Sequence, residues 1–267
     1  MSEIEWILLF LLLGCIVGFM AGLLGIGGGG IMVPALTSIF LLQGIPVENV
    51  VHLALGTSMA SIIATSISSL RAHHCNGGVL WDVFKAMAPG IIVGTFFATL
   101  FVSHISSFYL ALFFSVFMAY VAIKMFLNIQ SKPTRVLDNN TGLLIAGGGI
   151  GAISAIVSIG GGSLTVQYLL RQNIDIKKAI GTSAAIGLHI SISGTLGYVI
   201  NGWGSYSMGM YTFGYVNFPV VLLISVASFF MAPYGANLAH KLNISTLKKV
   251  FSILLIILSI KMLISVV

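Results

Sequence analysis

The chain has 267 residues, of which 58% are hydrophobic and only 7% are charged, and its formal net charge is +6. Soluble domains carry roughly a quarter charged residues, so this composition excludes a water-soluble domain and predicts a multi-pass α-helical membrane protein. The basic residues are not gathered into one patch with interleaved aromatic residues, which argues against nucleic acid as a partner. We therefore expect the lipid bilayer to surround most of the chain.

A glycine-broken hairpin opens the chain. The apolar run 6–24 is followed by the glycine-rich stretch 25–30 and by a short apolar piece, 31–42. A transmembrane helix needs about 20 apolar residues, which the first run supplies and the short piece does not. Glu3 and Glu5 stand where a signal peptide would carry basic residues, so we expect the first segment to stay in the mature protein. The pattern predicts a second helix that begins inside the membrane.

Both halves of the chain follow the same order of elements, which indicates an internal duplication. Three landmarks recur in that order: glycine-rich stretches at 25–30 and 158–163, Gly-Thr-Ser at 56–58 and 181–183, and Ile-Lys-Met at 123–125 and 260–262. Further spans are predicted at 52–70, 86–103, 107–128, 178–200, 218–239 and 246–267. The predicted fold class is an all-α polytopic membrane protein with two inverted repeats, each a glycine-broken hairpin plus three transmembrane helices.

A polar, proline-containing stretch that starts near residue 129 separates the repeats. It predicts a first transmembrane repeat over 1–130, a cytoplasmic linker over 131–140 and a second transmembrane repeat over 141–267, all within one membrane domain. The inverted orientation follows from loop charges. Basic residues at 171, 177 and 178 follow the second hairpin, whereas 43–51 contains no Lys or Arg. By the positive-inside rule, this reversal predicts inverted repeats in an inner (cytoplasmic) membrane, with both termini outside.

The two glycine-rich breaks have the properties of an anion site. A helix that begins inside the membrane leaves its first N–H groups without partners, and glycine lets several of them approach one ligand. The positive end of the helix dipole adds to this attraction. Inverted repeats bring both breaks near the bilayer midplane, where secondary transporters bind substrate. The alternative is that these glycines only allow close helix packing.

Candidate substrate-binding residues come from the breaks and from polar positions beside them. Hydroxyls of the two Gly-Thr-Ser motifs and the amide of Gln167 offer donors, although such groups also bond the helix itself or a neighbouring helix. His189 lies mid-span and is a candidate carrier of a coupled proton, or alternatively a neutral histidine bonded to its surroundings. The full set is Gly27, Gly28, Gly29, Gly30, Thr57, Ser58, Gly160, Gly161, Gly162, Ser163, Gln167, Thr182, Ser183 and His189.

Other ionisable residues lie near the ends of membrane spans, so we do not expect them to form a binding site. His52 lies near a span end, where we expect it to be solvated, and Lys124 is close enough to a span end to reach the membrane surface. The His-His-Cys sequence at 73–75 has no second cluster at ligand spacing, so we expect no metal site and no cofactor. The sequence lacks His-Glu-x-x-His and a convincing nucleophile–base pair, so we do not expect an enzyme.

The run Gly-Ile-Gly-Gly-Gly-Gly-Ile-Met-Val-Pro at 25–34, its echo at 158–166 and the paired Gly-Thr-Ser motifs resemble the sulfite exporter TauE/SafE family over nearly the whole chain. The segment 76–82 is similar to a short loop of that family, with its last three residues in scrambled order. The resemblance implies a prokaryotic permease for sulfite, sulfonates or related sulfur-containing anions, usually an exporter. Ser158 and Ser163 replace glycines of the first run, so the two hairpins need not contribute equally.

Together these features predict a secondary transporter, usually exporting, for a small sulfur-containing anion such as sulfite or an organosulfonate. The substrate is expected at midplane between the two half-helix N-termini, exposed alternately to each side, with uniport and proton coupling both feasible. The alternative is an anion channel that uses the same hairpins as a selectivity filter.

Overall fold

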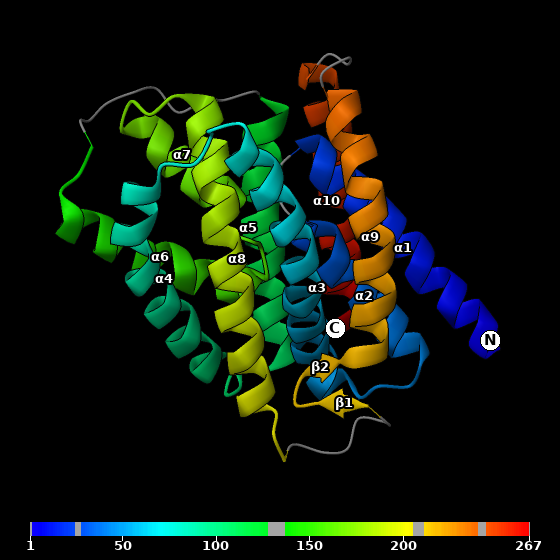
Figure 1. Ribbon diagram of the computed structural model, residues 1–267. Coiled ribbons are helices and arrows are strands. Elements are labelled where there is room, and N and C mark those ends of the chain that lie inside the picture. The colour runs from blue at the N-terminus through cyan, green and yellow to red at the C-terminus, as the bar shows by residue number, and fades with distance from the viewer. Residues whose placement is uncertain (1, 25–27, 128–136, 205–210, 240–243, 267) are drawn as a thin grey trace.

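The computed structural model describes residues 2–24, 28–127, 137–204, 211–239 and 244–266. Within these ranges the chain forms ten α-helices and one short β-hairpin (Figure 1). The first half supplies α1 (Glu3–Leu24), α2 (Gly29–Leu42), α3 (Val47–Cys75), α4 (Trp81–Val102) and α5 (Ser107–Phe126). The second half supplies α6 (Asn140–Val157), α7 (Gly162–Arg171), α8 (Ile176–Asn201), β1 (Thr212–Phe213), β2 (Val216–Asn217), α9 (Phe218–Ala239) and α10 (Ile244–Val266).

Each half is a long and a short helix followed by three long helices, as the sequence predicts. Residues 131–136 of the predicted linker lie outside the described residues, and α6 begins at the last linker position, Asn140. The side chain of Asn139 caps this helix by accepting a hydrogen bond from the Gly142 N–H at 2.9 Å. The division of the chain into two repeats and a linker stays a prediction.

Eight of the described helices are long and apolar enough to cross a membrane, and α2 is a shorter apolar helix. The outer helices present large apolar side chains to the surroundings: Phe101 of α4 is 69% exposed and Val116 of α5 is 63% exposed. Lipid tails, unlike water, accept such surfaces without cost. The chain is therefore a multi-pass α-helical membrane protein.

Two helices, α3 and α8, contact each other in the interior of the bundle (Figure 1). With 29 residues at about 1.5 Å each, α3 is about 44 Å long, well beyond the roughly 30 Å thickness of the hydrocarbon core. It therefore tilts or continues past the apolar region. This length explains why the helix runs to Cys75, five residues beyond the predicted span end.

Helices of the two halves pack in matched pairs. Helix α1 packs against α9, and its counterpart α6 packs against α4, the counterpart of α9. Glycines bring these backbones together, because an added Cβ at Gly18 would collide with the backbone of Ser228, and one at Gly94 with that of Gly148. The same pair of helices thus packs twice, each time with one helix from each half, which agrees with two similar halves. Their inverted orientation stays a prediction.

The connection between α8 and α9 contains structure that the sequence did not indicate. Strands β1 and β2 pair antiparallel, with Thr212 opposite Asn217 and Phe213 opposite Val216. The hairpin covers one end of α3 and places the Tyr215 ring 5.1 Å from the ring of His52. Consequently the expectation that His52 is solvated was wrong: it is 4% exposed, and its Nε2 lies 3.1 Å from the Val102 carbonyl oxygen.

Candidate functional site

The two glycine-rich breaks meet in the interior. Helix α6 ends just before Ser158, whose φ is 49°, and α7 starts just after Gly161, whose φ is 69°. Both values lie in the left-handed region, which turns the chain sharply and favours glycine. Gly29, the first residue of α2, lies so close to the Ser158 carbonyl that an added Cβ would collide with it. The structure thus brings the start of α2 into direct contact with the turn before α7.

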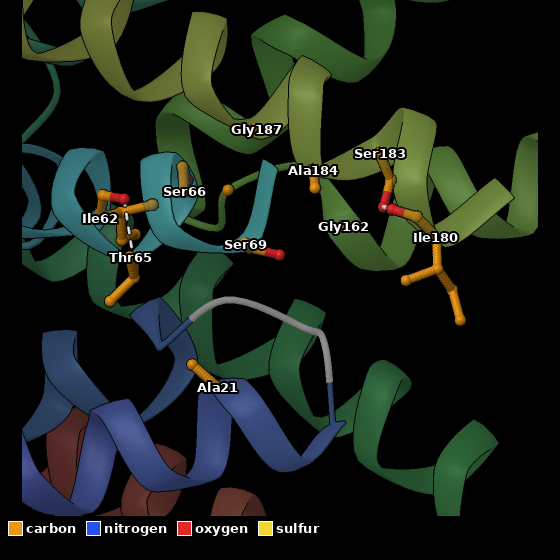
Figure 2. Close-up of a pocket in the computed structure, with 11 residues that line it drawn as sticks. Ala21, Ile62, Thr65, Ser66, Ser69, Gly162, Ile180, Ser183, Ala184 and Gly187 are labelled. Atoms are coloured by element: carbon orange, nitrogen blue, oxygen red, sulfur yellow. Dashed lines mark hydrogen bonds between the residues drawn. The ribbon is translucent and has the colours of Figure 1, made fainter. Parts of the chain in front are cut away.

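A cavity of about 50 Å³ lies beside the second break (Figure 2). Figure 2 shows lining residues of α3 and α8 on different sides of it, with Ala21 of α1 on another. One water molecule needs roughly 10–15 Å³ of such space, so the cavity suits a few water molecules or one small anion. The lining residues are Ala21, Ile62, Thr65, Ser66, Ser69, Gly160, Gly162, Ile180, Ser183, Ala184 and Gly187.

Hydroxyl groups supply the polar part of this lining. Thr65 and Ser183 donate to carbonyl oxygens one turn earlier in their own helices, at 2.9 and 2.8 Å. Ser66 is 8% exposed, and neither its Oγ nor that of Ser69 has a hydrogen bond within the described residues. Because residues three or four apart share a helix face, Thr65, Ser66 and Ser69 are presented together by α3. Two hydroxyls are therefore free to bind a ligand.

The start of α7 adds backbone donors at the same place. Within the described residues, the first N–H of α7 with a helical acceptor is that of Thr165, which donates to the Gly161 carbonyl at 2.9 Å. The preceding N–H groups belong to Gly162, Ser163 and Leu164, and none of them has a hydrogen-bond acceptor in the ranges that the structure describes, as at other helix starts. Ser163 Oγ and Thr165 Oγ1 are also buried, without a partner in the described part of the chain. Gly162 itself lines the cavity, so the positive end of α7 adjoins it.

Small residues hold the break against α3 and α8. An added Cβ at Gly187 would collide with the Gly160 carbonyl oxygen, so only glycine lets α8 approach the break this closely. Ile62 of α3 lies against both breaks, 3.3 Å from the Cβ position of Gly29 and 3.1 Å from that of Gly160. These contacts fix the walls of the cavity.

The threonines of the two Gly-Thr-Ser motifs bind loops. The Asn217 N–H donates to Thr57 Oγ1 at 3.1 Å, and the Leu80 N–H donates to Thr182 Oγ1 at 2.9 Å. The glycine before each threonine lies against a carbonyl of the same loop. Each Gly-Thr pair therefore docks a loop from the other half of the chain. Ser58 has a buried Oγ without a partner in the described ranges, but it does not line the cavity.

The start of α2 contributes packing rather than a cavity wall. An added Cβ at Gly28 would collide with Val17, and one at Gly30 would lie 2.5 Å from the Met118 Cε. The remaining candidate of this break, Gly27, lies outside the described residues. Among the described positions, the second break lines the cavity through Gly160 and Gly162, and the first does not.

Two further candidates are engaged elsewhere. Gln167 accepts a hydrogen bond from Lys124 Nζ at 2.5 Å, which joins α5 to α7. The Nδ1 of His189 lies 3.1 Å from the Ala185 carbonyl oxygen, and its ring meets that of Phe84 edge-on at 4.8 Å. Neither Gln167 nor His189 lines the cavity.

Thr65, Ser66, Ser69 and Gly187 were absent from the sequence candidates. The signal was present, because three hydroxyl residues at helical spacing follow the first Gly-Thr-Ser motif within one apolar span. Spacing alone does not tell which face of α3 meets the second break, so the assignment needed the packed structure.

The cavity lies toward one end of the bundle. Its walls come from the later part of α3 and the early part of α8. Arg71 follows the α3 wall in the chain, Lys178 precedes the α8 wall, and both side chains are exposed. Beyond the breaks, α3 and α8 pack directly, with Met59 side-chain atoms 3.2 Å from the Cβ position of Gly194. There the Tyr198 hydroxyl donates to the Ala155 carbonyl at 2.9 Å. On this side of the breaks, side chains therefore fill the space between α3 and α8.

Comparison with known proteins agrees with this architecture. The family model described as sulfite exporter TauE/SafE matches residues 10–262. A "probable membrane transporter protein" of Haemophilus influenzae is 39% identical over 259 residues, which cover 96% of this chain and 98% of the relative. Another protein of that description, from Methanocaldococcus jannaschii, is 29% identical over 260 residues and 95% of each chain. No solved structure matches. The chain therefore belongs to the sulfite exporter TauE/SafE family of membrane transporters.

Proposed function

We propose that this membrane transporter carries a small sulfur-containing anion, such as sulfite or a sulfonate, in the cavity beside the second break. The observation that carries the proposal is the convergence of free hydroxyls on Ser66 and Ser69 with the start of α7 at Gly162. Oxyanions accept several hydrogen bonds at once, and a helix start adds a positive dipole. The family description supports sulfur chemistry for the substrate.

The packing of α3 and α8 supports transport by alternating access. The cavity end carries Arg71 and Lys178, which the positive-inside rule assigns to the cytoplasm, so the anion loads from that side. Separation of Met59 from Gly194 at the other end then releases it outside. Export of an anion is favoured by an inside-negative potential by about 2.3 kcal/mol per charge per 100 mV. Potential-driven uniport is therefore sufficient.

Ser69 and Ser191 test the position of the site. Ser69 lines the cavity, and its Oγ has no hydrogen bond within the described residues. Ser191 is buried, donates to the carbonyl three residues earlier at 2.9 Å and does not line the cavity. In proteoliposomes, Ser69→Ala should lower the apparent affinity for sulfite, whereas Ser191→Ala should not. Equal effects of the two substitutions would move the site elsewhere.

The flux itself tests the function. Purified protein should give saturable, protein-dependent movement of sulfite or a sulfonate, and unlabelled substrate on one side should accelerate entry of labelled substrate from the other. Absence of flux across these anions with folded protein would refute the proposal. Conductance without saturation or counterflow would favour a channel that uses the same cavity.

A further inference from the structure

We infer that the transported species is a monovalent anion without an ammonium group, such as hydrogensulfite or a short alkanesulfonate. Dianions such as sulfate, and zwitterions such as taurine, are excluded. This inference rests on the proposed function and narrows its substrate class from the chemistry of the cavity walls.

The described walls of the cavity are uncharged, because their side chains are those of alanine, isoleucine, glycine, serine and threonine. The basic residues nearest in the chain are Arg71, two positions beyond Ser69, and Lys178, two positions before Ile180. Both are exposed, so they attract anions toward the entrance while the described walls hold no cation.

The magnitude of the substrate charge decides whether such a site is sufficient. The cost of removing an ion from water rises with the square of its charge, and proteins offset it by pairing the ion with opposite charges or by aiming hydrogen bonds at it. The hydroxyls of Ser66 and Ser69 and the N–H groups at the start of α7 are neutral donors. These few neutral donors suit one negative charge, whereas a buried dianion would need either a Lys or Arg partner or many more donors than the described walls offer.

The same walls reject an ammonium group. An ammonium ion buried away from water needs a carboxylate or several acceptors, and the described lining holds no Asp or Glu. The carbonyl oxygens one turn before Thr65 and Ser183 already accept hydrogen bonds from these side chains. A volume of about 50 Å³ further favours a compact oxyanion over one with a long substituent.

Sulfite itself provides the test, because its second ionisation lies near neutral pH and converts hydrogensulfite to the dianion. Proteoliposomes are loaded with wild-type protein, and the flux of labelled sulfite is measured at constant total concentration from about pH 6 to about pH 8. Methanesulfonate, a monoanion throughout this range, serves as the control for pH effects on the protein. Sulfate and taurine are added as competitors.

We expect sulfite flux to fall several-fold as the pH rises, in step with the hydrogensulfite concentration, while methanesulfonate flux stays constant. Methanesulfonate should compete with sulfite, and sulfate and taurine should not. Sulfite flux that is constant or rises with pH, or competition by sulfate or taurine, would overturn the inference and leave the proposed function intact. No flux of sulfite or methanesulfonate at any pH would overturn both.

Discussion

Replacement of Ser66 by alanine separates ligand binding from folding. Ser66 is 8% exposed and lines the cavity, and its Oγ has no hydrogen bond within the described residues. Ser66→Ala therefore removes a donor that folding does not use but that an anion in the cavity does. A hydrogen bond to a charged group contributes about 1.5–3 kcal/mol, so the Kd for the anion should rise about tenfold to about 100-fold.

Ser61 on the same helix gives the matched control. It is fully buried, does not line the cavity and donates to the Thr57 carbonyl at 2.9 Å. Ser61→Ala should cost about 1 kcal/mol of stability, because one internal hydrogen bond is lost, and should leave the Kd unchanged. We therefore expect Ser66→Ala to raise the Kd with little change in stability, and Ser61→Ala to lower stability with no change in the Kd.

Purified protein is titrated with methanesulfonate, and binding is measured by calorimetry and by the rise in Tm that ligand binding causes. Both variants are measured without ligand to obtain the change in stability. Wild-type affinity in Ser66→Ala, or an equal loss of affinity in Ser61→Ala, would show that the anion does not bind against this face of α3.

Two further substitutions test the walls and the docked loops. Gly187→Val should abolish transport, because the valine side chain would collide with the Gly160 carbonyl. Gly149→Ala should transport normally, because an added Cβ there meets nothing within 4 Å. Equal activity of the two variants would contradict the packing of α8 against the second break. Thr182→Val leaves the Leu80 N–H without its partner and should lower stability by about 1–3 kcal/mol with the Kd retained, and Thr182→Ser should restore stability. A Kd raised in Thr182→Val and restored in Thr182→Ser, with stability unchanged in both, would instead make the Thr182 hydroxyl a ligand.

Much of the architecture could be predicted from the sequence because membrane spans are long and apolar. The predicted short pieces after each break correspond to α2 and α7, and the span 218–239 matches α9. The hairpin β1–β2 could not be predicted, because its strands have only two residues each and pair over the buried end of α3. His52 was misplaced for the same reason, since that hairpin covers it.

The sequence placed candidate residues at a cavity, while their role in binding an anion stays a prediction. Among those candidates Gly160, Gly162 and Ser183 line the cavity. The Gly-Thr-Ser motifs were ambiguous, because a threonine hydroxyl serves a ligand or a loop equally well. Only the packed structure shows that Thr57 and Thr182 accept from backbone N–H groups of the opposite half.

In our proposal a small anion crosses the membrane through the cavity between α3, α8 and the start of α7. Counterflow of labelled sulfite at about pH 6, in proteoliposomes containing wild-type protein or Ser66→Ala, tests this route. We expect saturable counterflow for the wild type and a half-saturating concentration about tenfold higher or more for the variant. Absence of counterflow, or identical saturation curves for both proteins, would rule this route out.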